Sequence, residues 1–203
     1  MTGSLKLRLL AGAFFFIALG LIATWVSLQQ IFAGYVAAQY EREMSTVIDT
    51  LAAGLEFGDG DPVVAGMPAD PRFALPAGGR YWAIEPDGGE AIRSRSLWDT
   101  PLSGDHLTSS AHKAFATGEG PDGEPVLVLE RKLTFDTATG QRAADFYAAF
   151  PAGEIETALA GFRRELATML ALTAVILLLA AVFQVLVGLR PLGLLQAEVA
   201  KVR

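Results

Sequence analysis

The chain has 203 residues, of which 52% are hydrophobic, and it carries a formal net charge of −6 and no cysteine. Its mean hydropathy of +0.37 is too high for an ordinary soluble domain, whereas its charged fraction of 19% is too high for a protein made only of membrane spans. The apolar residues must therefore be concentrated in a few segments, and disulfide bonds cannot stabilise the remainder.

The first apolar segment covers residues 9–28 and contains no charged side chain. About 20 helical residues cross the roughly 30 Å hydrocarbon core of a bilayer, so this segment is long enough to span a membrane. A cleavable signal peptide is the alternative, because Lys6 and Arg8 precede the segment and residues 36–38 form an acceptable cleavage site. A signal-peptide core is normally about 7 to 15 residues long, which favours an uncleaved anchor.

The helical pattern continues beyond this span. Apolar residues recur in one stripe formed by Tyr40, Met44, Val47, Leu51 and Leu55. Glycine and proline in residues 58–62 oppose a helix, so we expect it to end near Phe57. The carboxylates at this end could bind a divalent cation, although a solvated loop is the preferred interpretation. They belong to Glu56, Asp59 and Asp61.

Two strands are predicted next, at residues 80–85 and 90–97, after a loop at residues 70–79. Residues 86–89 (Pro-Asp-Gly-Gly) are typical of a turn between them. The period of two in the second strand places Arg93 and Arg95 on one face with Leu97.

Arginine and aromatic residues on these two strands form the pattern most typical of a ligand site. The guanidinium groups of arginine bind anions, and the faces of aromatic rings bind other rings or cations. A structural role competes, because aromatic residues that face a sheet core and Arg–Asp pairs at sheet edges are common. The candidate ligand contacts are Arg93, Arg95, Trp98, Asp99, Tyr81 and Trp82.

Residues 106–117 predict a short helix, and residues 125–135 and 141–150 predict two strands with a turn between them. Residues 118–123 satisfy the pattern G-x-G-x-x-G, but they contain a proline and two acids and precede a strand, so we interpret them as a turn. His106 and His112 lack the neighbours that a metal site needs and are interpreted as surface residues. No arrangement of residues indicates a catalytic site, a metal site or a cofactor site.

A second apolar segment covers residues 166–189, and a helical stripe that begins near Glu154 leads into it. Basic residues precede the first span and follow the second span, and all but one of the 22 acidic residues lie between the spans. The positive-inside rule therefore predicts a cytoplasmic N-terminus (residues 1–8), an extracytoplasmic domain (residues 29–165) and a cytoplasmic C-terminal segment (residues 190–203).

The C-terminal segment has an apolar seam of the kind that packs against partner helices. Its residues are Pro191, Leu192, Leu195, Val199 and Val202, and we assign them to signal transmission. Because so short a seam does not associate stably alone, we expect the natural protein to continue beyond Arg203.

The layout of span, outer domain, span and basic-proline helix resembles the N-terminal part of bacterial two-component sensor histidine kinases. Residues 190–195 (Arg-Pro-Leu-Gly-Leu-Leu) match the opening of a HAMP linker. Residues 70–73, 81–84 and 94–99 are similar to segments of a subgroup with a PAS-like periplasmic sensor. The resemblance implies an α+β fold, in which a PAS-like (PDC-type) domain with an antiparallel sheet is flanked by long helices that continue into the membrane.

The same resemblance implies a homodimer through the stalk, membrane and HAMP helices, located in the bacterial inner membrane. ATP, Mg²⁺, the phosphoacceptor histidine and the contact with a response regulator would belong to domains beyond Arg203, so none is expected in this chain. We expect an unidentified periplasmic ligand or protein as stimulus, and no nucleic acid. The alternatives are the same input joined to a chemoreceptor or a diguanylate cyclase, and a non-signalling membrane scaffold.

Overall fold

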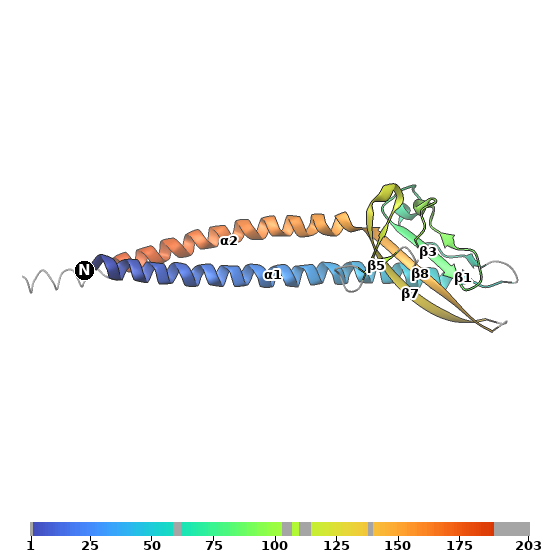
Figure 1. Cartoon of the computed structure of the whole chain (residues 1–203), viewed down its shortest axis with the longest axis horizontal. Helices are drawn as coiled ribbons and strands as arrows, with labels where there is room; N and C mark the ends of the chain where they lie inside the picture. The colour runs from blue at the N-terminus through green and yellow to red at the C-terminus, as the bar shows by residue number, and fades with distance from the viewer. Residues whose placement is uncertain (1, 59–61, 103–106, 110–114, 138–139, 189–203) are drawn as a thin grey trace, which may run out of the picture. The chain divides into compact units, whose positions relative to one another are not determined.

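The computed structural model describes residues 2–58, 62–102, 107–109, 115–137 and 140–188 (Figure 1). Among these, residues 2–32 and 160–188 form a helical unit, and the described part of residues 33–159 forms a sheet unit. Two long helices, α1 (Thr2–Gly54) and α2 (Ala152–Gly188), contribute to both units. The fold is α+β with two long apolar helices and an antiparallel sheet, which confirms the predicted class at this level. The PAS-like assignment stays a prediction.

The helical unit contains the two predicted spans. Both helices are long and apolar enough to cross a membrane. Side chains that a soluble protein would bury are exposed here, including Phe16 at 71% and Phe183 at 68%. Phe32 of α1 stacks on Phe162 of α2, with ring centroids 3.9 Å apart. Such continuous apolar exposure is what lipid-facing helices need, and it supports the two spans without showing a membrane.

The sheet unit is built on six antiparallel strands in the order β4–β3–β8–β7–β6–β5. Their bounds are β3 Tyr81–Pro86, β4 Ile92–Arg93, β5 Thr108–Ser109, β6 Ala116–Glu119, β7 Pro125–Thr137 and β8 Gly140–Pro151. The long hairpin of β7 and β8 pairs from Val126 with Pro151 to Thr137 with Gly140, which confirms the two strands predicted there. Pro151 is followed directly by α2, as the sequence also predicts.

The two faces of the sheet bury different groups of residues. One face carries Arg80 and Phe150, and Phe150 packs edge-on against Tyr40 of α1. We call this the α1 face. The opposite face buries a cluster made by Tyr81, Ala83, Leu97, Leu102, Val126, Val128, Tyr147 and Ala149. Because consecutive strand residues point to opposite faces, Tyr81 and Trp82 lie on opposite faces of the sheet.

Helix α1 ends at Gly54, before the predicted end at Phe57. Leu55 and Glu56 instead form strand β1 (Leu55–Glu56), which pairs with β2 (Val63–Val64). The backbones meet closely here, since a Cβ on Gly54 would lie 2.6 Å from the amide nitrogen of Gly66. Strand pairing therefore takes over the backbone hydrogen bonds that a further helical turn would have made.

The strand predicted at residues 90–97 is wrong beyond Arg93. Only Ile92 and Arg93 pair with β3, and residues Arg95–Leu97 form a 3-10 helix, η2. The cause is side-chain competition: the Ser94 hydroxyl accepts a hydrogen bond from the Trp82 amide at 3.1 Å, and the Ser96 hydroxyl donates to the Arg80 carbonyl at 2.5 Å. These bonds fold the chain back onto β3, and Leu97 is buried rather than exposed with the arginines.

The helix predicted at residues 106–117 is also wrong where the structure describes the chain. Thr108 and Ser109 pair with Thr117 and Ala116, so this region extends the sheet. The open edge of β7 offers backbone partners to β6, and the resulting ladder overrides a weak local helical pattern. His106, His112 and the acidic residues Asp59 and Asp61 lie outside the described residues, as do the signal-transmission residues Pro191 to Val202.

Candidate functional site

A cavity of about 470 Å³ lies between a loop and the edge of the sheet where β4 pairs with β3. The loop, residues 67–74, is called the strap below. The cavity also borders β3, β4 and η2, and it is called the strap cavity. Its lining residues are Met67, Pro68, Ala69, Asp70, Pro71, Phe73, Ala74, Trp82, Arg93, Ser94 and Arg95. The volume suits a small organic molecule.

Local sequence fixes the shape of the strap. Asp70 caps a short 3-10 helix, η1 (Pro71–Phe73), by accepting from the Arg72 amide at 2.9 Å, and Pro71 sets the first helical backbone angle. Phe73 is buried below the turn. At Gly78 a Cβ would collide with the carbonyl oxygen of Arg72, so a side chain there would displace the strap.

The charge of Asp70 is neutralised inside the strap. Both of its carboxylate oxygens accept from the Arg72 guanidinium, at 2.6 to 3.1 Å. These hydrogen bonds lower the pKa of Asp70 and raise that of Arg72. The acid in the cavity wall therefore contributes little net negative charge.

The structure divides the six predicted ligand contacts into two groups. Trp82, Arg93 and Arg95 line the strap cavity together. Tyr81 does not, because it belongs to the buried cluster on the opposite face, where its hydroxyl donates to Glu124. Its burial and this carboxylate raise the pKa of Tyr81.

The other two predicted contacts also lie outside the strap cavity. Trp98 and Asp99 are exposed and do not line it, although Trp98 is unusual in having a φ of 54°. Positive φ is rare for a bulky residue and marks local backbone strain. The strap cavity therefore brings three of the six predicted contacts together and leaves the other three outside it.

A buried arginine of the α1 face is a second feature, which the sequence did not indicate. Arg80 is 4% exposed, and its two terminal nitrogens each lie 2.9 Å from one carboxylate oxygen of Glu154 in the first turn of α2. The guanidinium also lies over the ring of Phe150, with its central carbon 3.9 Å from the centroid. No local motif could have revealed this pair, since 74 residues separate its members.

Residues of α1 complete this cluster. The Tyr40 hydroxyl donates to Glu154 at 3.3 Å, and Glu43 lies 3.7 Å from the Arg80 Nε, which makes no hydrogen bond among the described residues. Burial raises the pKa of Tyr40, and the charge of Glu154 raises it further. Burial alone would raise the pKa of Glu154, but the hydrogen bonds and charge of Arg80 outweigh it and lower that pKa. We call Arg80, Glu154, Tyr40 and Glu43 the arginine cluster.

A second cavity lies between the strap and α1, beside Glu43 of the arginine cluster. It measures about 440 Å³ and is lined on one side by α1 residues, among them Glu43 and Val47. Its opposite wall is the strap, because the two cavities share Met67, Pro68, Ala69, Asp70 and Phe73. The strap therefore separates the two cavities, one beside the sheet edge and the other beside α1.

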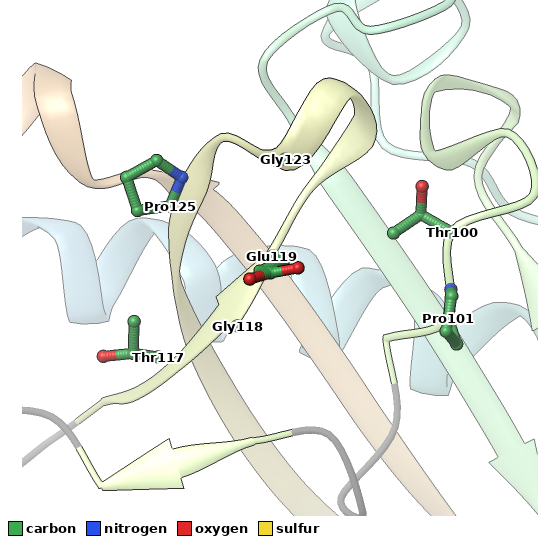
Figure 2. A pocket seen from close by; sticks show the side chains of 7 residues that line it. All are labelled: Thr100, Pro101, Thr117, Gly118, Glu119, Gly123 and Pro125. Atoms are coloured by element: carbon green, nitrogen blue, oxygen red, sulfur yellow. The ribbon is translucent and has the colours of Figure 1, made fainter.

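The G-x-G-x-x-G segment borders a third cavity, of about 490 Å³ (Figure 2). Its first residues end β6, a 3-10 helix η4 (Pro121–Gly123) turns the chain, and β7 follows, so a strand succeeds this segment as predicted. Glu119 is the only charged side chain among the described residues that line this cavity. An acid at this position opposes phosphate binding.

Comparison with known proteins adds no name to this site. No family model, no curated protein and no solved structure matches the chain. Among the described residues, no group of three His, Cys, Asp or Glu side chains is arranged to hold a metal ion.

Proposed function

We propose that the chain is the input and transmembrane region of a bacterial membrane receptor, with its sheet unit in the periplasm and both termini in the cytoplasm. The output is a histidine kinase joined after Arg203 through a HAMP linker. A chemoreceptor or a diguanylate cyclase would use the same input.

The observation that carries this proposal is the connection between the last strand and α2. Strand β8 ends at Pro151 and α2 begins at Ala152, with no linker between them. The same helix contains the second apolar segment. A rigid helix transmits a displacement at one end as a rotation or shift at the other, whereas a flexible linker would absorb it.

The arginine cluster gives this connection a second support. Glu154 belongs to the first turn of α2, and its carboxylate is held by Arg80, directly before β3, and by Tyr40 of α1. A stimulus shifts such an assembly only if it binds one arrangement more tightly than the other. The cluster is the contact through which a change in the sheet unit would bias α2.

Helical phase provides the test of transmission. Two alanines inserted between Gly161 and Leu166 advance the helix by about 200°, whereas seven advance it by two turns less about 20°. In a fusion of the chain to a HAMP and kinase region, the two-residue insertion should lock or invert kinase output, and the seven-residue insertion should restore regulation. Normal regulation in both variants would contradict a rigid helical link.

Topology can be tested separately, because the chain contains no cysteine. Glu90 is exposed on the sheet unit, so E90C should react with a membrane-impermeant maleimide added outside intact cells. T2C should react only after the cells are opened. Labelling of T2C from outside, or protection of E90C, would overturn the proposed orientation.

A further inference from the structure

The strap cavity combines apolar walls with a polar edge. Most of its lining residues are apolar, and the aromatic rings of Phe73 and Trp82 are buried, at 6% and 2% exposure. Water gains little from contact with such walls, so an apolar group that enters the cavity is stabilised by leaving water. The aromatic rings favour a flat, ring-containing group.

Two arginines at this edge have no acidic partner. Arg72, Arg80 and Arg131 of the same unit each form an ion pair with a carboxylate. Arg93 and Arg95 form none with a described residue, and both are exposed. Among the described residues, Asp70 is the only acid in the cavity wall, and its oxygens are already bound by Arg72. The edge of the cavity therefore has an uncompensated positive charge.

We propose that the strap cavity binds a small organic acid, whose aromatic or otherwise apolar body lies against Phe73 and Trp82 and whose carboxylate is held by Arg93 and Arg95. Guanidinium groups pair with carboxylates in two-point geometry, which supplies specificity against neutral analogues of the same shape. That this acid is the stimulus of the receptor rests on the proposed function, whereas its binding does not.

The position of the strap explains how occupancy would reach the helices. A ligand in the strap cavity presses on the wall that also faces Val47 and Glu43 of α1 across the second cavity. Arg72 of the strap lies 3.9 Å from Glu154, the α2 member of the arginine cluster. A displacement of the strap therefore acts on α1 through packing and on α2 through charge.

Calorimetry on the full chain in lipid nanodiscs tests the binding. The probes are 3-phenylpropanoate and its neutral amide, 3-phenylpropanamide, which have nearly the same shape. At pH 7 the carboxylate should bind at least about tenfold more tightly than the amide, and the difference should shrink as salt increases. Inorganic phosphate, which has no apolar body, should compete weakly.

Matched variants locate the site. The double variant R93Q/R95Q should lose the preference for the carboxylate, whereas R142Q, which removes an arginine on β8 that lies over the Phe57 ring, should retain it. Tryptophan fluorescence gives a second readout: W82F should abolish the change caused by the ligand, and W98F should not. Because Arg93 and Arg95 are exposed, the double variant should melt at the wild-type temperature.

The outcomes are decisive in both directions. Equal binding of acid and amide, an unchanged preference in R93Q/R95Q, or no heat with either probe up to about 10 mM would overturn this assignment. Such a result would leave the helical-phase and topology experiments untouched, since neither uses a ligand. Conversely, binding with normal regulation in both insertion variants would retain the site and reject the receptor mechanism.

Discussion

The sheet unit contains arginines in two opposite situations. Arg80 is buried, paired with Glu154 and stacked on Phe150. Arg93 and Arg95 lie at the cavity edge, exposed and without a carboxylate partner among the described residues. A buried charge must be compensated within the fold, so Arg80 is part of the structure, whereas an exposed, unpaired arginine remains free to bind a ligand. Burial and pairing thus separate two functions that residue type alone does not distinguish.

The largest expected effect is a loss of stability, and it distinguishes the buried, paired arginine from the exposed, unpaired ones. R80M should lower the free energy of unfolding of the sheet unit by about 2–3 kcal/mol, because it leaves Glu154 without its main partner. R93M should change it by less than about 0.5 kcal/mol. Urea unfolding of the full chain in detergent, followed by tryptophan fluorescence, measures both. Equal effects in the two variants would remove the distinction between structural and free arginines.

A second prediction concerns the close approach of two backbone segments at the end of α1. G54A should destabilise the sheet unit by about 1–3 kcal/mol, since its Cβ would lie 2.6 Å from the Gly66 nitrogen and backbone must move. G66A is the matched control, because its Cβ would meet the Gly54 Cα at an ordinary 3.5 Å. The same unfolding measurement applies. If both variants unfold at the same denaturant concentration, the close approach of the two backbones is not a constraint.

Acid should weaken the ion pair between Arg80 and Glu154 and should not affect Arg93 and Arg95. The pKa of Glu154 is lowered from its ordinary value of 4.5, so its stabilising effect is present above that value and is lost as pH falls through the lower, folded-state pKa. Asp70 behaves in the same way. Melting temperatures between pH 7 and 3 should therefore fall in the acid range, and E154Q should fall less steeply. A parallel decline in wild type and E154Q would assign the acid effect to other groups.

The smallest effect is expected for a third, intermediate arginine. Arg131 reaches Asp49 at 2.8 Å and the Ser45 hydroxyl at 2.9 Å, but its side chain is 37% exposed and that of Asp49 is 67% exposed. Solvent screens such pairs, so R131M should cost about 0–1 kcal/mol and D49N about the same. A double-mutant cycle of these two changes isolates the pair. A coupling as large as that between Arg80 and Glu154 would show that exposure is not the deciding factor.

The sequence predicted those elements whose signal is local and repeated. The two apolar segments, the hairpin of β7 and β8 and the helix that starts α2 all have long uninterrupted patterns. Prediction from the sequence failed where contacts between two distant segments determine the local structure. Ser94 and Ser96 alternate like strand residues, yet their hydroxyls bond to the backbone of Trp82 and Arg80 and bend the chain into η2.

The candidate site shows the same limit. Arginine and aromatic composition was enough to select Trp82, Arg93 and Arg95, which the cavity does bring together. The strap could not be predicted as its other wall, because residues 67–74 meet the sheet only through tertiary packing. The pairing of Glu154 with Arg80 could not be predicted either, because nothing near either residue indicates a partner so far away in the chain.

The hydrogen bond from the Ala77 amide to the Ser96 carbonyl, 3.1 Å long, joins the segment after the strap to η2, and two residues of these segments have a positive φ. Ala77 has a φ of 50° and Trp98 a φ of 54°. Each conformation is unfavourable for an L-residue by roughly 1–3 kcal/mol, and the folded state bears that cost permanently. The Ala77–Ser96 hydrogen bond, and not a ligand, therefore holds η2 to the segment after the strap, so binding need not lose affinity to form that contact.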